Sequence, residues 1–487
     1  MPLILAIDEG TTGVRAYVFD EQAKVRGQAY AELEQSFPHP GWVEQDPEMI
    51  WERTLQVCRQ ALEAARVAGR DLAALGVCTQ RSTTLVWERS SGKPVYPAIV
   101  WQDTRTAARV PELVAQGVFT NAMASASKLE WILDHVPGAR GRAEQGALCF
   151  GTVDSWLLWN LCRGAVHATD HSNASCTTLY DPFSGSWHLP ALEVLRIPAS
   201  MLPQIESSSC RFGEADPSWF GAPVPVASLA GDQQAALFGE LGWSRGAAKI
   251  TLGTSAMADV HTGTELVVSS HGAYPLVLCS LAGERNFCLE GTAIAAGAAM
   301  QWLRDGLGVL GRLEDASSIA NSVPDAGGVW AVPAFQGLGT PHMDPHARAV
   351  IGGLSRASQR AHVVRALLEG IAFRCHEVLA TLFEDAGLPF PERLRVDGGA
   401  AANDFLLQQI ANTIGRVVER PASLQASVLG AAYLAGLATG VWHSTDELAA
   451  TWRSGGTFEP QWTEMERQHR YERWRTALDA ARLGSLP

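Results

Sequence analysis

The first candidate for chemistry is a short turn near the N-terminus. Asp8 and Glu9 end an apolar stretch, Gly10-Thr11-Thr12-Gly13 follows, and Arg15 begins a second alternating stretch. Glycine permits close approach of a ligand, and successive backbone N–H groups with threonine hydroxyls can coordinate phosphate oxygens. Asp8 could then face a Mg²⁺ ion held by that phosphate. The alternative interpretation is an ordinary turn at the end of a strand.

A second candidate lies near the middle of the chain. Small residues up to Gly231 lead to Asp232-Gln233-Gln234, after which an apolar helix is expected. A carboxylate in this place can accept a proton from a substrate hydroxyl, while Gln233 orients the substrate. The structural alternative is that Asp232 only caps the helix.

A third candidate is a glycine pair late in the sequence. Arg395 to Asp397 is predicted as a strand, Gly398 and Gly399 follow, and a helix is expected after Asn403. Such a turn lets a flat ligand lie against the backbone. A plain strand-to-helix loop is the commoner explanation of a glycine pair.

The elements that must position these residues alternate between strand and helix. An Asp46 N-cap candidate and Pro47, suited to the first helical position, predict a helix that continues through Leu62. The other elements predicted in this half are strands at 3–7, 15–19, 28–34, 75–79 and 84–88, and helices at 105–116 and 128–134. The pattern is typical of an α/β fold.

The opening pattern returns near residue 247. A strand, the turn Gly253-Thr254-Ser255 and another strand follow one another there, about half a chain after the first turn. This indicates a duplicated domain, although two short turns can also coincide by chance. The length of 487 residues allows about two to four domains. We predict two, residues 1–245 and 246–487.

Composition excludes several classes of protein. The formal net charge of −13 argues against nucleic acid or an anionic membrane as the main partner. No apolar stretch approaches the roughly 20 residues that span a bilayer, and the start lacks the basic region of a signal peptide. The nine cysteines are scattered, without metal-ligand spacing, and indicate thiols of a reducing compartment. We expect a cytoplasmic protein; the sequence leaves open whether it forms a homo-oligomer.

Together the segments resemble the FGGY family of carbohydrate kinases, and within it the glycerol kinase branch, over essentially the whole chain. The matching stretches are Ala6–Thr12, Pro40–Pro47, Ile99–Thr106, Gly151–Trp156, Asn173–Ser175, Ala230–Gly239, Val332–Gly339, the Asp397 loop and Leu429–Leu437. The resemblance implies two actin-like, ribonuclease-H-like ATPase domains around a central cleft. The first would hold the sugar or polyol, and the second most of the nucleotide.

The resemblance also implies a role for each matching residue. Asp232 would be the general base on the acceptor hydroxyl, and Asp8 and Asp232 would lie near Mg²⁺. The residues implied to bind ATP are Thr11, Thr12, Gly13 and Arg15 in the first half, and Thr254, Gly297, Gln301, Gly399 and Asn403 in the second. The residues implied to surround the acceptor are Arg81, Ser82, Trp101, Met123, Asp232, Gln233 and Met257.

Three acceptor positions depart from the pattern of glycerol kinases. Ser82 stands where they carry glutamate, Met123 replaces a tyrosine, and Met257 replaces an aromatic residue; Glu9 also stands where they usually have glutamine. Losing a charged hydrogen-bond acceptor costs about 1.5–3 kcal/mol. The resemblance implies an ATP-dependent kinase for glycerol or a related polyol or sugar. From the departures we expect an acceptor that is larger than glycerol or less hydroxylated at one end, with glycerol itself a poor substrate. The alternatives are a tetritol, pentitol or ketopentose kinase of the same family, and a non-catalytic ATP-binding regulator.

Overall fold

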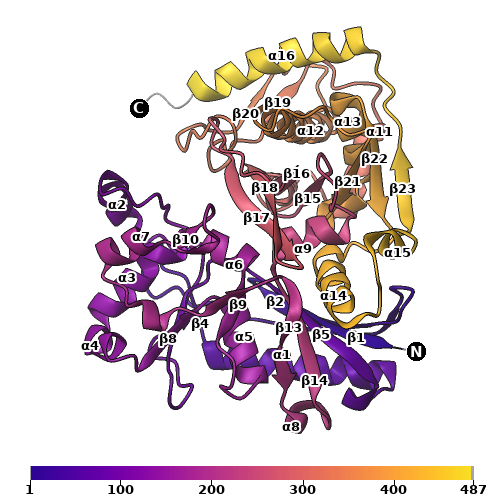
Figure 1. Ribbon diagram of the computed structural model, residues 1–487. Coiled ribbons are helices and arrows are strands. Elements are labelled where there is room, and N and C mark those ends of the chain that lie inside the picture. The colour runs from indigo at the N-terminus through magenta and orange to yellow at the C-terminus, as the bar shows by residue number, and fades with distance from the viewer. Residues whose placement is uncertain (1, 484–487) are drawn as a thin grey trace. The chain divides into compact units, whose positions relative to one another are not determined.

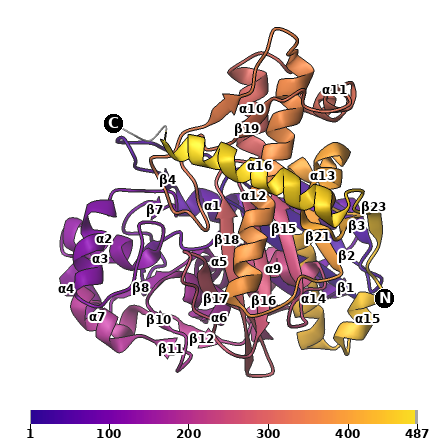
Figure 2. The same ribbon diagram turned by 90° about the horizontal axis from the view of Figure 1, so that it is seen from above.

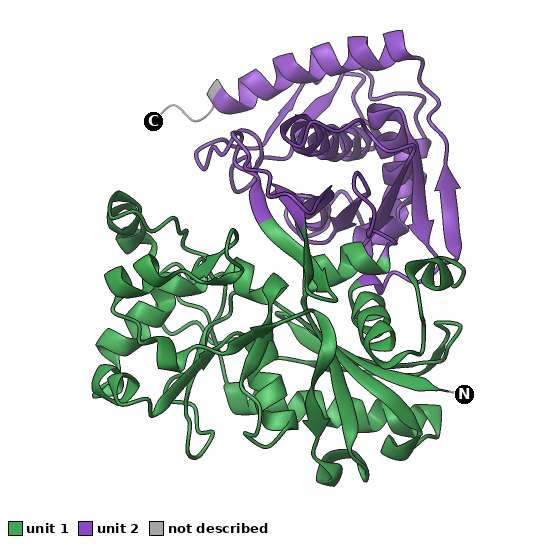
Figure 3. Ribbon diagram, in the orientation of Figure 1, with its two compact units in different colours: residues 1–239, 276–286, 427–451 green, residues 240–275, 287–426, 452–487 purple. Residues whose placement is uncertain are grey.

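The structure is a computed structural model that describes residues 2–483. The chain divides into two units (Figure 3). Unit 1 comprises Met1–Gly239, Leu276–Asn286 and Ser427–Thr451, and unit 2 comprises Glu240–Pro275, Phe287–Ala426 and Trp452–Pro487. Two later segments thus belong to the unit built by the N-terminal half. The functional division into residues 1–245 and 246–487 stays a prediction.

Unit 1 is built on a mixed sheet whose strands run in the order β17-β13-β14-β5-β1-β2-β3 (Figure 1). Its strands are β1 (Leu3–Glu9), β2 (Gly13–Phe19), β3 (Val25–Glu32), β5 (Leu72–Thr79), β13 (Ser209–Ala215), β14 (Val224–Gly231) and β17 (Tyr274–Leu281). The hairpin β1–β2 and the pair β2–β3 are antiparallel, whereas β1, β5 and β14 run parallel to one another.

The parallel strands bring the predicted site residues to one edge. Asp8 lies opposite Cys78 in the register of β1 and β5, and Gly231 lies opposite Thr79 in the register of β14 and β5. The carboxyl ends of parallel strands meet at the same edge of a sheet, which is where α/β proteins bind ligands. Asp8 therefore lies at this edge near the end of β1, and Arg81 and Asp232 lie there just after β5 and β14.

Helix α1 (Pro47–Ala65) covers β2 and β3 and begins as predicted. The Asp46 side chain accepts a hydrogen bond of 2.9 Å from the backbone N–H of Glu48, and Pro47 occupies the first turn. A Cβ atom added at Gly27 on β3 would lie 2.4 Å from the carbonyl oxygen of Ala61, so helix and strand pack backbone to backbone. Ile50 and Leu62 of α1 and Ala29 and Ala31 of β3 belong to the same apolar core.

The other helices of unit 1 are mostly short. They are α2 (Val110–Ala115), α3 (Ser125–His135), α4 (Ala139–Glu144), α5 (Val153–Leu161), α6 (His171–Cys176), α7 (Leu189–Leu195), α8 (Pro217–Phe220), α9 (Asp232–Gly239), α14 (Ala426–Thr439) and α15 (Thr445–Ala449). Four strand pairs lie outside the main sheet: β4 (Glu44–Gln45) with β7 (Ala98–Ile99), β6 (Leu85–Glu88) with β8 (Leu148–Gly151), β9 (Ala168–Asp170) with β12 (Gln204–Glu206), and β10 (Tyr180–Asp181) with β11 (Ser186–Trp187).

The predicted helix at 105–116 was wrong over its first five residues. α2 begins only at Val110, after a 3₁₀ turn at Ala107–Arg109. The reason lies in Arg105, whose side chain is buried and bonds Asp103 and Glu44 at 2.8 Å while stacking on Trp42. These tertiary contacts keep the chain non-helical there, and propensity alone does not reveal them.

The main strands of unit 2 follow one another in the order β23-β22-β21-β15-β16-β18. The strands are β15 (Ala248–Leu252), β16 (Ala256–Gly263), β18 (Glu284–Ala293), β21 (Arg393–Asp397), β22 (Val417–Pro421) and β23 (Ser454–Phe458), with a separate pair β19 (Trp330–Val332) and β20 (Val350–Gly352). The helices are α10 (Gly297–Asp305), α11 (Ala316–Asn321), α12 (Arg360–Asp385), α13 (Asp404–Ile414) and α16 (Glu464–Leu483). Figure 2 shows α16 crossing α12, where Phe373 and Trp474 stack with ring centroids 5.3 Å apart.

The repeat predicted near residue 247 is confirmed by strand pairing. The series β3-β2-β1-β5-β14 in unit 1 corresponds to β18-β16-β15-β21-β22 in unit 2. In both series the first three strands pair antiparallel and the last three parallel. The turns at Gly10-Thr11-Thr12 and Gly253-Thr254-Ser255 thus occupy equivalent places in two copies of one motif. Among residues 2–483, no helix has the length and apolarity needed to cross a membrane.

Candidate active site

Asp8 lies at the end of β1 and is almost fully buried. One of its oxygens, Oδ2, accepts a hydrogen bond of 2.9 Å from the Ser427 hydroxyl and lies 3.5 Å from Nη1 of Arg15. Burial raises the pKa of this carboxyl, while the Arg15 guanidinium and the Ser427 hydroxyl oppose the shift. The predicted metal ligand is therefore a buried carboxyl group of unit 1 with the Arg15 guanidinium nearby.

Glu9 points into unit 1. Its side chain is fully buried, and the Gln80 amide donates to its two oxygens at 3.2 and 3.4 Å. The same Gln80 nitrogen lies 2.9 Å from Oε1 of Gln45. Burial raises the pKa of Glu9 well above its usual range, and the nearby carboxylates Asp8 and Asp232 add to the shift. The extra carboxyl noted in the sequence is thus held by an amide network.

The first hydroxyl turn is closed by a hydrogen bond of 3.0 Å from the Gly10 N–H to the Gly13 carbonyl. Thr11 is anchored from both sides: its hydroxyl accepts from the Trp101 indole at 2.9 Å, and its carbonyl accepts from the Gln45 amide at 2.8 Å. Thr12 is exposed. A Cβ atom at Gly13 would lie 2.5 Å from the ring of half-exposed Tyr30, so a larger residue there would have to displace that ring.

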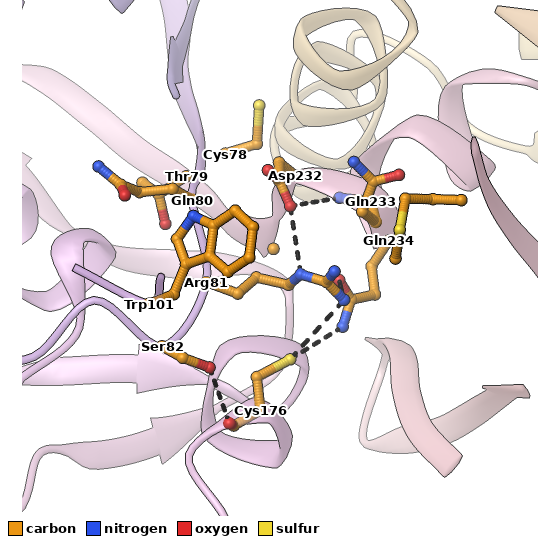
Figure 4. Close-up of polar contacts among 12 residues, drawn as sticks. Cys78, Thr79, Gln80, Arg81, Ser82, Trp101, Cys176, Asp232, Gln233 and Gln234 are labelled. Atoms are coloured by element: carbon orange, nitrogen blue, oxygen red, sulfur yellow. Dashed lines mark hydrogen bonds and ion pairs between the residues drawn. The ribbon is translucent and has the colours of Figure 1, made fainter. Parts of the chain in front are cut away.

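Arg81 and Asp232 lie together at the edge of the sheet (Figure 4). Nε of Arg81 is 3.2 Å from Oδ1 of Asp232, and Nη1 is 3.3 Å from Oε1 of Gln234. Oδ1 of Asp232 also accepts a bond of 2.7 Å from the Gln233 backbone N–H. Because a Cβ atom at Gly231 would lie 2.8 Å from Cδ of Arg81, the glycine before Asp232 makes room for the arginine.

Ser82 is brought next to this pair, but its hydroxyl turns away. Ser82 has a left-handed backbone, with φ of 62°, and its Oγ donates to the carbonyl oxygen of Cys176 at 2.8 Å (Figure 4). The sulfur of Cys176 lies 3.5 Å from the Gln234 amide nitrogen and 4.0 Å from Nη1 of Arg81. Next to Arg81, the side chain at position 82 thus supplies no charge.

Trp101 links the acceptor residues to the first hydroxyl turn. Its backbone N–H donates to the Thr83 hydroxyl at 3.3 Å, and its indole N–H reaches Thr11. Met123 is less constrained: its side chain is 41% exposed, and its backbone N–H donates to the Asn121 side chain at 2.8 Å.

The second hydroxyl turn in unit 2 supports the start of α10. The Gly253 carbonyl accepts from the Gly297 N–H at 2.9 Å, and the Thr254 carbonyl accepts from the Ala296 and Ala298 N–H groups, each at 3.0 Å. A Cβ atom at Gly297 would lie 2.5 Å from the Gly253 carbonyl oxygen. Thr254 and Gln301 are both exposed. Turn and helix therefore form one rigid group within unit 2.

The glycine pair leaves an open surface in unit 2. Gly398 has φ of 87° and lies against the Leu252 backbone, whereas a Cβ atom at Gly399 would meet nothing within 4 Å. The Asn403 side chain caps α13 by accepting from the Leu406 N–H at 3.0 Å. Met257 lies on β16, where its sulfur accepts a hydrogen bond of 3.2 Å from the Thr292 hydroxyl.

Three residues of this region had no recognised signal in the sequence. Ser427 contacts Asp8 although 419 positions separate them, and no local pattern predicts that contact. Gln234 stood inside the Asp232 motif without a role, and the structure shows it holding Arg81. Lys128 was expected only to begin a helix, yet it is a fully buried lysine.

Asp8 and Asp232 are the two carboxylates that the resemblance assigns to a metal ion. Among the described residues, no group of three or more histidine, cysteine, aspartate or glutamate side chains is placed to hold one. Mg²⁺ suits such a site, because it is usually bound through one or two carboxylates together with substrate phosphates and water. Asp8 and Asp232 offer the oxygens that this ion prefers.

Comparison with known proteins gives a consistent result over the full chain. Residues 3–239 match the N-terminal domain, and residues 248–439 the C-terminal domain, of the FGGY family of carbohydrate kinases. A glycerol kinase of Bordetella parapertussis is 48% identical, covering 99% of this chain and 98% of its own. A glycerol kinase of Ralstonia nicotianae is 46% identical, covering 99% of each chain.

Solved structures agree with these sequence matches. A Plasmodium falciparum glycerol kinase with ADP superposes with a TM-score of 0.93 at 30% identity, covering 99% of this chain and 98% of that one. A gluconate kinase of Lactobacillus acidophilus, at 18% identity, has a TM-score of 0.88 over 99% of this chain and 98% of that one, which shows the shared fold. The fold is the two-domain actin-like ATPase fold, and the chain belongs to the FGGY family of carbohydrate kinases.

Proposed function

We propose that the protein is an ATP-dependent kinase that transfers the γ-phosphoryl group of ATP to a hydroxyl of glycerol or a closely related polyol. The observation that carries the proposal is the contact of Asp232 with Arg81 at the carboxyl ends of β5 and β14. A carboxylate held beside a guanidinium can orient an acceptor hydroxyl and take its proton. The full-length glycerol kinase relatives support the same assignment.

Within unit 1, each residue has a defined task. Asp232 accepts the proton of the attacking hydroxyl, and Arg81, Trp101 and Gln233 hold the acceptor. Thr11, Thr12, Gly13 and Arg15 present hydroxyls, backbone N–H groups and a cation to the transferred phosphoryl group. Mg²⁺, held by Asp8 and Asp232 with the phosphates, would neutralise charge on ATP. Phosphoryl transfer depends mainly on such positioning and electrostatics. Hydroxyls, backbone N–H groups, an arginine and two carboxylates are therefore the types of group that the reaction needs.

In this proposal, residues of unit 2 bind most of the nucleotide. Thr254 would contact the remaining phosphates, and Gly297 and Gln301 on α10 would line the nucleoside together with Gly399 and Asn403. The open surface at Gly399 supports this, because a flat base can lie where a side chain would otherwise stand. Asn403 can contribute only the part of its amide that does not cap α13.

The pocket residues determine how tightly an acceptor is held. The Ser82 hydroxyl is directed to Cys176, and Met123 and Met257 provide thioethers without strong acceptors. Affinity must then come from Arg81, Trp101, Asp232 and Gln233. The full-length relatives favour glycerol over a tetritol, pentitol or ketopentose. A non-catalytic regulator is not favoured, since such a protein has no need of Asp232 beside Arg81.

We place this kinase in the cytoplasm. Within the described residues the nine cysteines form no disulfide, and most of them are buried, as suits a reducing compartment. We further propose that small molecules are its partners, and that nucleic acid and membranes are not, on the basis of the net charge of −13.

A panel of acceptors tests the proposed function. The protein is incubated with ATP and Mg²⁺ and with glycerol, erythritol, xylitol or a ketopentose, and both ADP and the phosphorylated acceptor are quantified by mass spectrometry. We expect the highest kcat/KM with glycerol and one phosphorylated product per ADP. A better acceptor in the panel would correct the substrate, and ADP formation without any phosphorylated acceptor would refute the kinase assignment.

A further inference from the structure

Lys128 is an unusual lysine for this chain. Only four of the 38 basic residues are lysines, namely Lys24, Lys93, Lys128 and Lys249. Lys24 and Lys93 are exposed, and buried Lys249 has a carboxylate partner, Asp259, at 2.8 Å. Lys128 is fully buried, and no carboxylate among the described residues forms an ion pair with it.

Two backbone carbonyls serve as its partners instead. Nζ of Lys128 donates to the carbonyl oxygen of Trp101 at 3.0 Å and to that of Met123 at 2.8 Å. Trp101 and Met123 are separated by 22 positions, and both were assigned to the acceptor pocket independently of Lys128. One ammonium group thus fixes two pocket residues relative to each other through their main chains.

The start of α3 holds a third pocket residue. The Ser125 hydroxyl, one turn before Lys128, donates to the Ser82 carbonyl at 3.0 Å. The Ser127 hydroxyl bonds that of Thr106 at 2.8 Å, which ties the segment after Trp101 to the same helix. The first turn of α3 is therefore a support on which the backbones of Ser82, Trp101 and Met123 rest.

We propose that Lys128 is a positioning residue for the acceptor, which holds Trp101 and Met123 at their places in the pocket wall. This inference rests on the proposed function, because it takes these two residues as acceptor contacts. Lys128 itself touches neither of the reacting groups in this assignment. It acts through the indole of Trp101, which in turn bonds the Thr11 hydroxyl.

Energetics support a role beyond folding. Burial lowers the pKa of Lys128 to about 7, an effect that Arg105 reinforces and Asp103 opposes. An apolar side chain of similar length would fill the same space without the desolvation cost of a buried ammonium. It would also leave the Trp101 and Met123 carbonyls without this donor and free to shift. Compared with such a side chain, the lysine therefore adds one thing: it fixes the positions of the loops that carry Trp101 and Met123.

The test is Lys128→Met, with exposed Lys24→Met as the matched control. We expect the KM for the best acceptor to rise about tenfold or more, as loss of a charged hydrogen bond predicts. The KM for ATP should stay unchanged, and Lys128→Arg, which keeps a cationic donor, should recover part of the loss. An unchanged acceptor KM, or equal increases in both KM values, would overturn the proposal.

A second measurement does not need activity. Hydrogen exchange of Lys128→Met should be faster in peptides covering residues 99–106 and 120–126, and unchanged in unit 2. Exchange unchanged in both segments, or faster everywhere, would contradict the positioning role. If Lys128→Met does not fold, Lys128→Gln, which retains an amide donor, replaces it in both measurements. If the wild type phosphorylates no acceptor, the proposed function fails, while the exchange experiment still decides the role of Lys128.

Discussion

Nε of Arg81 lies 3.2 Å from Oδ1 of Asp232, and the same guanidinium reaches Gln234. Both side chains are partly accessible, at 15% and 28% exposed. The proposed base is therefore held at a fixed place by a cation before an acceptor arrives, and little reorganisation is required on binding. In the same unit, the indole of Trp101 bonds the hydroxyl of Thr11 in the first hydroxyl turn.

Thr11 and Trp101 should be energetically coupled in catalysis. Thr11→Val removes the hydroxyl that accepts from the indole at 2.9 Å, and Trp101→Phe removes the donor. Each variant should lower kcat/KM for glycerol, and the coupling energy should be about 0.5–1.5 kcal/mol, the usual value of one hydrogen bond. A double-mutant cycle measures it. Strictly additive effects would mean that this bond contributes nothing to transfer.

Two glycines of unit 2 should respond differently to alanine. Gly399→Ala adds a methyl group where nothing lies within 4 Å, so the melting temperature without ligand should not change. Gly297→Ala forces a methyl group to within 2.5 Å of the Gly253 carbonyl oxygen, so it should lower that temperature.

With ADP added, the Gly399→Ala protein should lose most of the thermal stabilisation that the wild type gains, because the methyl group takes the space proposed for the nucleoside. Thermal denaturation with and without ADP measures both quantities. A normal ADP shift in Gly399→Ala would remove Gly399 from the nucleotide site.

Glu9→Gln should stabilise the protein, and more so as the pH rises. Burial raises the pKa of Glu9 above its unfolded value, so the folded state binds a proton that the unfolded state has lost. The stability contributed by Glu9 is therefore complete below the unfolded pKa near 4.3 and falls as the pH rises towards the folded value. Glutamine keeps the acceptor for Gln80 and carries no such proton.

Urea denaturation of both proteins between pH 5 and pH 8 tests this, with the difference in unfolding free energy plotted against pH. A constant difference would show that Glu9 does not change its protonation on unfolding in this range.

The partly buried His167 should contribute to acid lability. Burial lowers the pKa of His167 to about 4, although its Nε2 bonds the Phe150 carbonyl at 2.8 Å. The contribution is complete above the unfolded pKa near 6.5 and is lost as the pH falls towards 4, in total up to about 3 kcal/mol. His167→Gln, which keeps a donor for Phe150, should reduce the slope of stability against pH in this window. Exposed His443→Gln is the control and should leave the slope unchanged.

The sequence predicted most of what local pattern can specify. Both hydroxyl turns and the Asp46 cap of α1 were predicted in place, because turns and caps are local properties. The helix expected after Gln234 was also found, but it already begins at Asp232. The repeat was visible because each copy carries the same turn between strands.

What the sequence did not reveal depends on distant contacts. The late start of α2 follows from Arg105 being pulled into ion pairs with Asp103 and Glu44. Ser427 reaches Asp8 only after the chain returns to unit 1. Lys128 was noted only as a helix residue, since nothing local marks a lysine whose partners are the carbonyls of Trp101 and Met123.

The central claim is that Asp232 is the base for phosphoryl transfer, and single-turnover transfer from ATP to glycerol tests it most directly. The rate is compared between the wild type and Asp232→Asn, with ADP binding in the absence of Mg²⁺ measured by calorimetry as a check on folding. Our account predicts a rate about 10²- to 10⁴-fold lower for Asp232→Asn, with ADP affinity retained. Transfer to glycerol at the wild-type rate in Asp232→Asn would contradict it.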